Sequence, residues 1–103
     1  MRMRWIPVAI PLAAVVQLAT AAVTDADRTQ VYQSFRAQFD ARRYQEALPI
    51  AERLVALTEE QYGADDRALV NPLTNLGTTD YRLHDYPGAE KNYLPSVEIL
   101  ARP

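Results

Sequence analysis

The chain has 103 residues, 49% hydrophobic and 23% charged, which is enough for one small core. It contains no cysteine, and this excludes disulfides, thiol catalysis and thiolate metal sites. Its formal net charge of −2 argues against nucleic-acid binding, which normally needs a basic face, and its only basic doublet, Arg42-Arg43, falls in a predicted turn.

Residues 1–22 have the form of a secretory signal peptide. Arg2 and Arg4 precede an uncharged run, Ile6 to Ala22, that ends in small residues. We expect cleavage after Ala21 or Ala22, which would place the mature protein in the periplasm or outside a bacterial cell. The alternative is an uncleaved N-terminal apolar helix, although the run is short of the roughly 20 strongly apolar residues that span a bilayer. No membrane contact is predicted beyond this segment.

Residues 23–62 predict a first helical hairpin. Its first helix is expected over residues 26–40, after the capping residues Thr24, Asp25 and Asp27. After a short turn, apolar side chains recur at helical spacing from Tyr44 to Leu57. Pro49 lies inside this second helix, where we expect a bend rather than a stop.

Residues 63–103 predict a second hairpin, which breaks at His84-Asp85. One face of its first helix carries Leu73, Leu76, Gly77 and Tyr81. After the break a second stripe recurs at a spacing of three or four: Tyr86, Ala89, Tyr93, Val97 and Leu100. We expect the two stripes to face each other, with a neighbouring helix passing close to Gly77.

Two prolines leave helix boundaries open in the second hairpin. Pro72 either bends a helix that begins at Arg67 or is the first residue of a helix that follows Asn71. Pro95 poses the same question in the last helix. Four helices are expected with either boundary.

Small and large residues in this order resemble the tetratricopeptide repeat. The family's packing positions are occupied by Leu73, Leu76, Gly77, Tyr86, Ala89 and Tyr93. The runs Asn75-Leu76-Gly77 and Tyr86-Pro87-Gly88-Ala89 are most similar to the longer repeats of kinesin light chains and their bacterial relatives. A shift of 42 residues lays Tyr44 on Tyr86 and Ala47 on Ala89, so the first hairpin resembles a degenerate copy of the second.

Three positions depart from the family pattern. Ser96 replaces the usual Ala, His84 replaces the usual Gly, and Phe35 stands where Gly or Ala is expected. The resemblance implies an all-α fold of about two repeats and four helices, forming a short right-handed α-solenoid after the signal segment.

The resemblance also implies a non-catalytic module that binds a protein or peptide. In the family, the first helix of each hairpin lines a concave groove, and the corresponding positions are Tyr32, Arg36, Phe39, Asn71, Thr74, Asn75, Thr78 and Arg82. Asn75 and Arg82 are the strongest candidates, because an Asn side chain can pair with both the N–H and the C=O of a peptide, and Arg can bind acidic groups. The lysines of the family's chaperone-tail clamp are missing from this face.

The last helix leaves a second function open. Its apolar residues Leu94, Ile99 and Leu100 are not followed by a polar capping helix, and two hairpins are fewer than repeat arrays normally need. The alternative is therefore a structural or assembly subunit, or a fragment of a longer repeat protein. Such a chain would dock through its open C-terminal end, on another copy or on further repeats.

No residue pattern predicts catalysis, a cofactor or a bound metal. The sequence lacks a nucleophile elbow, a P-loop, an HExxH motif and a glycine-rich dinucleotide turn. His84, the sole histidine, lies near Asp80 and Asp85 and could act as a general base or metal ligand, but a polar residue at a helix end is the simpler interpretation. The pairs Glu59-Glu60 and Asp65-Asp66 lack the pattern of a calcium loop.

Overall fold

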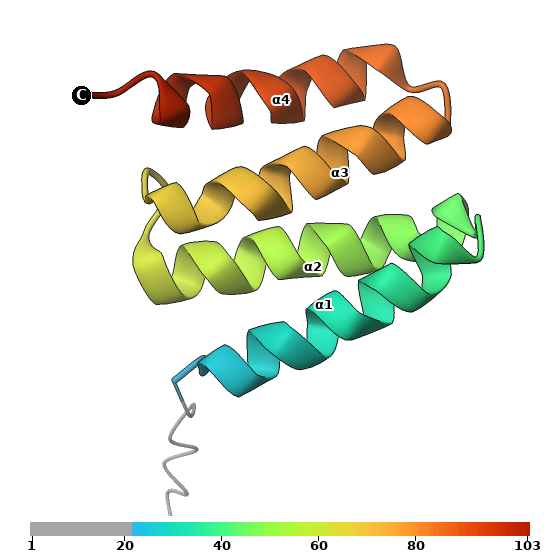
Figure 1. Cartoon of the computed structure of the whole chain (residues 1–103), viewed down its shortest axis with the longest axis horizontal. Helices are drawn as coiled ribbons and strands as arrows, with labels where there is room; N and C mark the ends of the chain where they lie inside the picture. Colours follow the sequence, from blue (N-terminus) through green and yellow to red (C-terminus); the bar gives the residue numbers. More distant parts are fainter. Residues whose placement is uncertain (1–21) are drawn as a thin grey trace, which may run out of the picture.

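A computed structural model describes residues 22–103, and the predicted signal segment lies outside them up to Ala21. The described residues are all helical apart from short connections, as the sequence predicts. In chain order the elements are α1 (Asp25–Asp40), α2 (Tyr44–Tyr62), the 3₁₀ turn η2 (Arg67–Leu69), α3 (Val70–Arg82) and α4 (Tyr86–Leu100). Each α-helix lies beside the preceding one, so two hairpins, α1–α2 and α3–α4, stack in chain order (Figure 1). None of the helices in this part of the chain has the length and apolar character needed to cross a bilayer.

Polar side chains cap the starts of three of these elements. At α1 the N–H of Asp27 donates to Thr24 Oγ1 (3.2 Å) and the N–H of Thr24 donates to Asp27 Oδ2 (2.9 Å), which is a capping box. Asp66 caps η2, and Asp85 accepts from the N–H of Gly88 (3.0 Å) at α4. The expected capping of the first helix is confirmed, and the helix begins one residue earlier than expected.

Pro49, Pro72 and Pro95 lie inside helices without ending them. α2 is continuous through Pro49 and α4 is continuous through Pro95. Pro72 is the third residue of α3, in the first turn, where a missing N–H costs no intrahelical hydrogen bond. The helical segment thus begins at Arg67, but as a 3₁₀ turn that becomes an α-helix at Val70.

The core consists of two clusters that meet at α2 and α3. The first joins the hairpins and contains Phe35, Ala47, Ala51 and Leu76. The second lies toward the C-terminus of α4 and contains Leu69, Leu73 and Ile99. Val55 packs against both clusters, so α2 links them. Phe35, where the repeat pattern has a small residue, is 1% exposed and fills the space between α1 and its neighbours.

Gly77 allows α4 to approach α3 closely, as predicted. A Cβ atom added at Gly77 would lie 2.7 Å from Cε1 of Tyr93, well inside van der Waals contact. The hydroxyl of Tyr93 is hydrogen-bonded to Thr78 Oγ1 at 2.8 Å, which holds the ring in this place. Any larger residue at 77 would therefore displace the Tyr93 ring or separate the two helices.

The prediction that the second stripe faces α3 is wrong for most of its large residues. Tyr86, Val97 and Leu100 are exposed, as is Tyr81 at the end of α3. Ala89 of the stripe is buried and Tyr93 packs against Gly77, but the other buried residues of α4 are Ser96 and Ile99, which lie in the adjacent row. The buried row is the more polar of the two, since it contains Ser96 and the half-buried Asn92, so apolar periodicity favoured the other row.

A polar contact accompanies this orientation of α4. Asp80 is 6% exposed, and its Oδ2 accepts a hydrogen bond from Asn92 Nδ2 at 2.7 Å. Burial raises the pKa of Asp80, although the bond from Asn92 acts in the opposite direction. Because Asn92 belongs to the same row as Ala89, Ser96 and Ile99, the contact turns this row toward α3.

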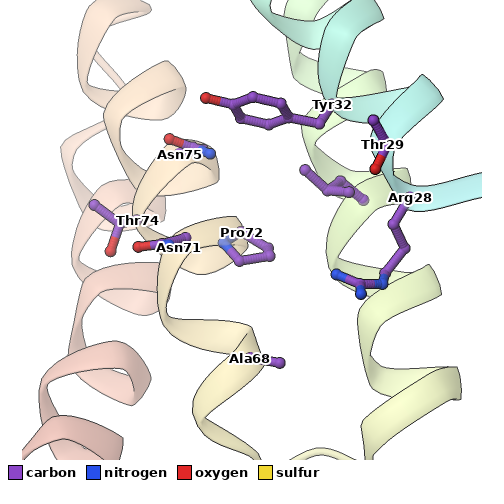
Figure 2. A pocket seen from close by; sticks show the side chains of 9 residues that line it. Arg28, Thr29, Tyr32, Ala68, Asn71, Pro72, Thr74 and Asn75 are labelled. Atoms are coloured by element: carbon purple, nitrogen blue, oxygen red, sulfur yellow. The ribbon is translucent and has the colours of Figure 1, made fainter. Parts of the chain in front are cut away.

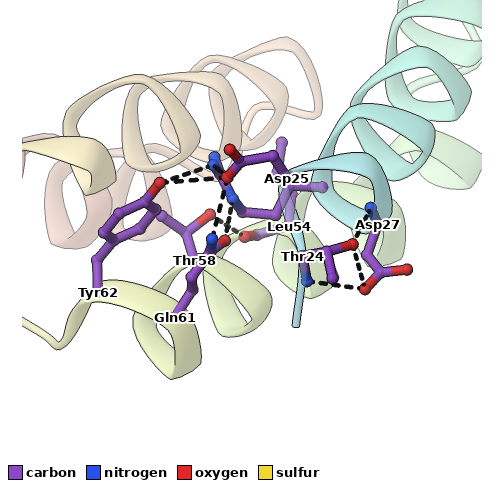
Figure 3. Close-up of polar contacts among 8 residues, drawn as sticks. Thr24, Asp25, Asp27, Leu54, Thr58, Gln61 and Tyr62 are labelled. Carbon is purple, nitrogen blue, oxygen red and sulfur yellow. Dashed lines mark hydrogen bonds and ion pairs between the residues drawn. The ribbon is translucent and has the colours of Figure 1, made fainter. Parts of the chain in front are cut away.

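A polar network fastens the start of α1 to the end of α2 (Figure 3). Asp25 Oδ1 accepts hydrogen bonds from Arg28 Nη2 (2.6 Å), Gln61 Nε2 (3.0 Å) and the Tyr62 hydroxyl (3.3 Å). The guanidinium of Arg28 also lies 4.9 Å from the centre of the Tyr62 ring. The hydrogen bond from Arg28, followed by those from Gln61 and Tyr62, lowers the pKa of Asp25.

Both hairpins turn in the same way. After α1 the N–H of Arg42 donates to Phe39 O and that of Arg43 donates to Gln38 O, each at 2.9 Å. After α3 the equivalent bonds run from His84 to Tyr81 O (3.0 Å) and from Asp85 to Asp80 O (2.9 Å). These are two Schellman motifs. Their left-handed residues, Arg42 (φ 60°) and His84 (φ 64°), stand 42 residues apart, which agrees with the repeat shift.

Glycine in place of His84 or Arg42 is expected to stabilise the fold. The left-handed conformation costs a non-glycine residue about 1–2 kcal/mol, and the greater freedom of glycine in the unfolded chain offsets part of the gain. We expect His84→Gly and Arg42→Gly each to raise the free energy of unfolding by about 0.5–1 kcal/mol, measured by urea denaturation. Arg43→Gly is the control, because Arg43 has φ −93°. An equal increase in the free energy of unfolding for Arg43→Gly, or no increase for the other two variants, would contradict the assignment of Arg42 and His84 as left-handed residues.

Asp25 is expected to make the fold sensitive to acid. A carboxyl group whose pKa is lowered by folding stabilises the native state above its unfolded pKa, and this contribution is lost as the pH falls through the native value. Asp25→Asn should therefore lower the urea midpoint at neutral pH and lose less stability than the wild type on acidification. Glu52→Gln, an exposed change on α2, is the matched control. If Asp25→Asn and the wild type lose the same stability on acidification, Asp25 does not contribute to the acid sensitivity.

Candidate functional site

A cavity of about 510 Å³ lies between α1 and the start of α3 (Figure 2). It contains four of the eight predicted groove residues: Tyr32, Asn71, Thr74 and Asn75. Figure 2 shows the Tyr32 ring reaching from α1 toward α3, where Asn71 and Asn75 lie one helical turn apart. The fold thus brings residues from both predicted hairpins to one place.

The base of the cavity is apolar. Leu54 is 4% exposed and Pro72 is buried, and both line the cavity beneath the polar side chains. The first-turn position of Pro72 on α3 places its ring here without breaking the helix. The site therefore combines an apolar base with a polar rim.

Two of the other predicted residues, Phe39 and Thr78, are engaged within the fold. Phe39 is half-buried, and its ring packs against those of Phe35 and Tyr44 at centroid distances of 5.4 and 5.2 Å. Thr78 is bonded to Tyr93 and also half-buried. Neither residue lines the cavity.

The two predicted arginines also lie outside the cavity. Arg36 forms an ion pair with Asp40, in which Nη2 and Oδ1 are 2.6 Å apart. Arg82, at the far end of α3, has its guanidinium carbon 6.0 Å from the centre of the Tyr44 ring. A ligand confined to the cavity would not reach either charge.

Sequence reasoning missed three polar or small residues of the cavity: Arg28, Thr29 and Ala68. Arg28 and Thr29 precede Tyr32 by four and three residues, so they share its helical face and that spacing could have identified them. Ala68 precedes Asn71 and Asn75 by three and seven residues, so it shares their face if the helical segment begins at Arg67, one of the two boundaries that the sequence left open.

Within the part of the chain that the structure describes, the cavity offers two unpaired amides and two unpaired hydroxyls, those of Tyr32 and Thr29, and its only charge is balanced. Asn71, Asn75 and Tyr32 form no side-chain hydrogen bond with any other residue in the range 22–103. Thr74 instead donates to Val70 O (2.7 Å). The cation of Arg28 is already paired with Asp25, so the polar rim presents mainly groups that can exchange hydrogen bonds with a neutral ligand.

The polar side chains around His84 are engaged in contacts within the fold. The ring of His84 is exposed, and Nδ1 lies 3.1 Å from the Tyr86 hydroxyl. Asp80 is bonded to Asn92, and Asp85 caps α4, so both carboxylates have structural partners. Between residues 22 and 103, no three His, Cys, Asp or Glu side chains lie together so that they could hold a metal ion.

Comparison with known proteins adds one finding. The family model described as Tetratricopeptide repeat matches residues 36–102, from the second half of α1 to the end of α4. No curated protein and no solved structure matches the chain. The matched region includes both hairpin turns and all of α2, α3 and α4. The chain therefore belongs to the tetratricopeptide repeat family.

Proposed function

We propose that the chain is an exported, non-catalytic interaction module that binds a peptide segment or helix of another protein in the cavity between α1 and α3. Tetratricopeptide repeats are generally interaction modules rather than enzymes, which supports the class of function. We further propose that its repeats are of the longer kinesin-light-chain-like subtype and form a short right-handed α-solenoid. The 42-residue spacing of the two Schellman motifs supports this proposal.

One observation carries the proposal for the cavity. Asn71 and Asn75 occupy successive turns of one face of α3, opposite Tyr32 of α1, and none of the three has a side-chain partner in the described chain. An asparagine side chain can donate to a peptide C=O and accept from a peptide N–H at the same time. Two of them in a row suit the repeating polar groups of a bound backbone.

The charges around the cavity favour an uncharged ligand segment. Arg28 is paired with Asp25, and Arg36, outside the cavity, is paired with Asp40. An acidic ligand side chain would have to compete for one of these cations, whereas an apolar side chain can contact Leu54 and Pro72 directly. A longer ligand that follows α3 beyond the cavity would reach Arg82, where an acidic residue would be accommodated.

The cavity residues are expected to control peptide affinity. A peptide selected from a random library by the wild-type chain should bind Asn71→Ala and Asn75→Ala roughly three- to tenfold more weakly, because each variant loses about one hydrogen-bonding group. Isothermal titration calorimetry measures the change, and circular dichroism checks that both variants remain helical.

Gln45→Ala is the matched control for this measurement, since Gln45 is an exposed amide on α2 that does not line the cavity. Arg82→Ala should weaken only peptides long enough to reach the end of α3. Equal losses for Gln45→Ala and Asn75→Ala, or none for either asparagine, would place the binding site elsewhere.

Export rests on the N-terminal sequence. When residues 1–103 are produced in a bacterium, we expect the periplasmic or secreted fraction to contain a chain that begins at Ala22 or Val23, measured by intact mass. Val15→Arg interrupts the uncharged run, and it should leave the uncleaved chain inside the cell. A wild-type chain that keeps residues 1–21 in the cytoplasm would reject the proposed export.

A further inference from the structure

The outer face of α4 is apolar and exposed. It consists of Tyr86, Leu94, Val97 and Leu100, together with the adjoining Tyr81 of α3, and each of these side chains is between 51% and 58% exposed. In Figure 1, α4 forms the edge of the stack, and no helix of the described chain covers it on the side away from α3. We call this surface the α4 face.

A shallow groove of about 400 Å³ follows part of the α4 face. Its walls are almost entirely apolar, and Glu90 is the only charged residue among those that line it. The half-buried Tyr93, fixed by its bond to Thr78, forms part of the groove floor. The face therefore has a preformed apolar surface that an apolar helix can contact.

Two charges of opposite sign flank the α4 face. Lys91 and Glu98 are both exposed and stand seven residues apart, so they lie on the same side of the helix, two turns from each other. Neither forms an ion pair with another residue in the described chain. Leu94 lies between them along the helix.

We propose that the α4 face is the contact between two copies of this chain. The copies are related by a two-fold axis that crosses α4 beside Leu94, so that the two α4 helices run antiparallel. In this arrangement Lys91 of each copy lies opposite Glu98 of the other, and both charges are paired. A parallel arrangement would place Lys91 opposite Lys91 and Glu98 opposite Glu98, so the charges select the antiparallel one.

The exposed apolar area is sufficient for such a dimer. Five large side chains that are about half exposed offer roughly 100 Å² each, or roughly 500 Å² per copy. A standard interface buries about 800 Å² per partner. Because homodimer interfaces are about 65% apolar, such an interface needs roughly 500 Å² of apolar area from each copy, which is what the α4 face offers. Lys91, Glu98 and their neighbours supply the polar part of the interface.

The dimer is independent of the proposed ligand site. No residue of the α4 face lines the cavity between α1 and α3. Substitutions on the α4 face should therefore change association without changing peptide affinity, and substitutions at Asn71 or Asn75 should do the reverse. Failure of either proposal can be recognised separately.

Sedimentation equilibrium of the purified chain over a wide concentration range tests the contact. The wild type should form dimers, and Leu94→Glu should weaken dimerisation at least about a hundredfold, because it places a carboxylate at the two-fold axis. Leu94 is half-exposed, so the variant should keep its helical circular dichroism. Ala56→Glu, an exposed change on α2, is the matched control and should dimerise like the wild type.

Charge reversal tests the antiparallel arrangement. Lys91→Glu and Glu98→Lys should each weaken the dimer by about tenfold, since each change creates two like-charged pairs. The double variant restores both pairs and should return to wild-type affinity. A wild type that is monomeric at all concentrations or forms larger species, a dimer that survives Leu94→Glu, or a double reversal without recovery would each overturn the proposal.

Discussion

The close contact between α3 and α4 is the constraint on which the rest of the second hairpin depends. Gly77 leaves room for the Tyr93 ring, and Thr78 and Asn92 supply the hydrogen bonds that hold α4 in one rotation about its axis. This rotation buries Ser96 and Ile99 and leaves Val97 in solvent. The same contact thus completes the core and creates the exposed α4 face.

α3 contacts the core with one side and the cavity with another. One side carries Leu73 and Leu76, which belong to the two core clusters, and a second side carries Asn71 and Asn75, which face the cavity. α3 follows a 3₁₀ turn, and Pro72 in its first helical turn forms part of the cavity base. The amide rim is therefore supported by packed side chains, which keeps it in place before any ligand binds.

Four of the nine cavity residues were predictable because helical spacing and the family resemblance assign residues to faces. Tyr32, Asn71, Thr74 and Asn75 were placed together in this way. The prediction included Arg36, Phe39, Thr78 and Arg82 on the same grounds, and the structure separates them from the cavity. Spacing cannot show that Phe39 packs between two rings, that Thr78 binds Tyr93 or that Arg36 pairs with Asp40, because those partners come from contacts in three dimensions.

The sequence by itself determined the four helices, the capping box at Thr24, the turns after α1 and α3, and the repeat to which both belong. These features depend on residues within one or two helical turns of each other, so their physical causes are local. Only the tertiary structure decided which row of α4 is buried and which groove residues meet. Both outcomes depend on the rotation of one helix against another, which is set by distant pairs such as Gly77 with Tyr93 and Asp80 with Asn92.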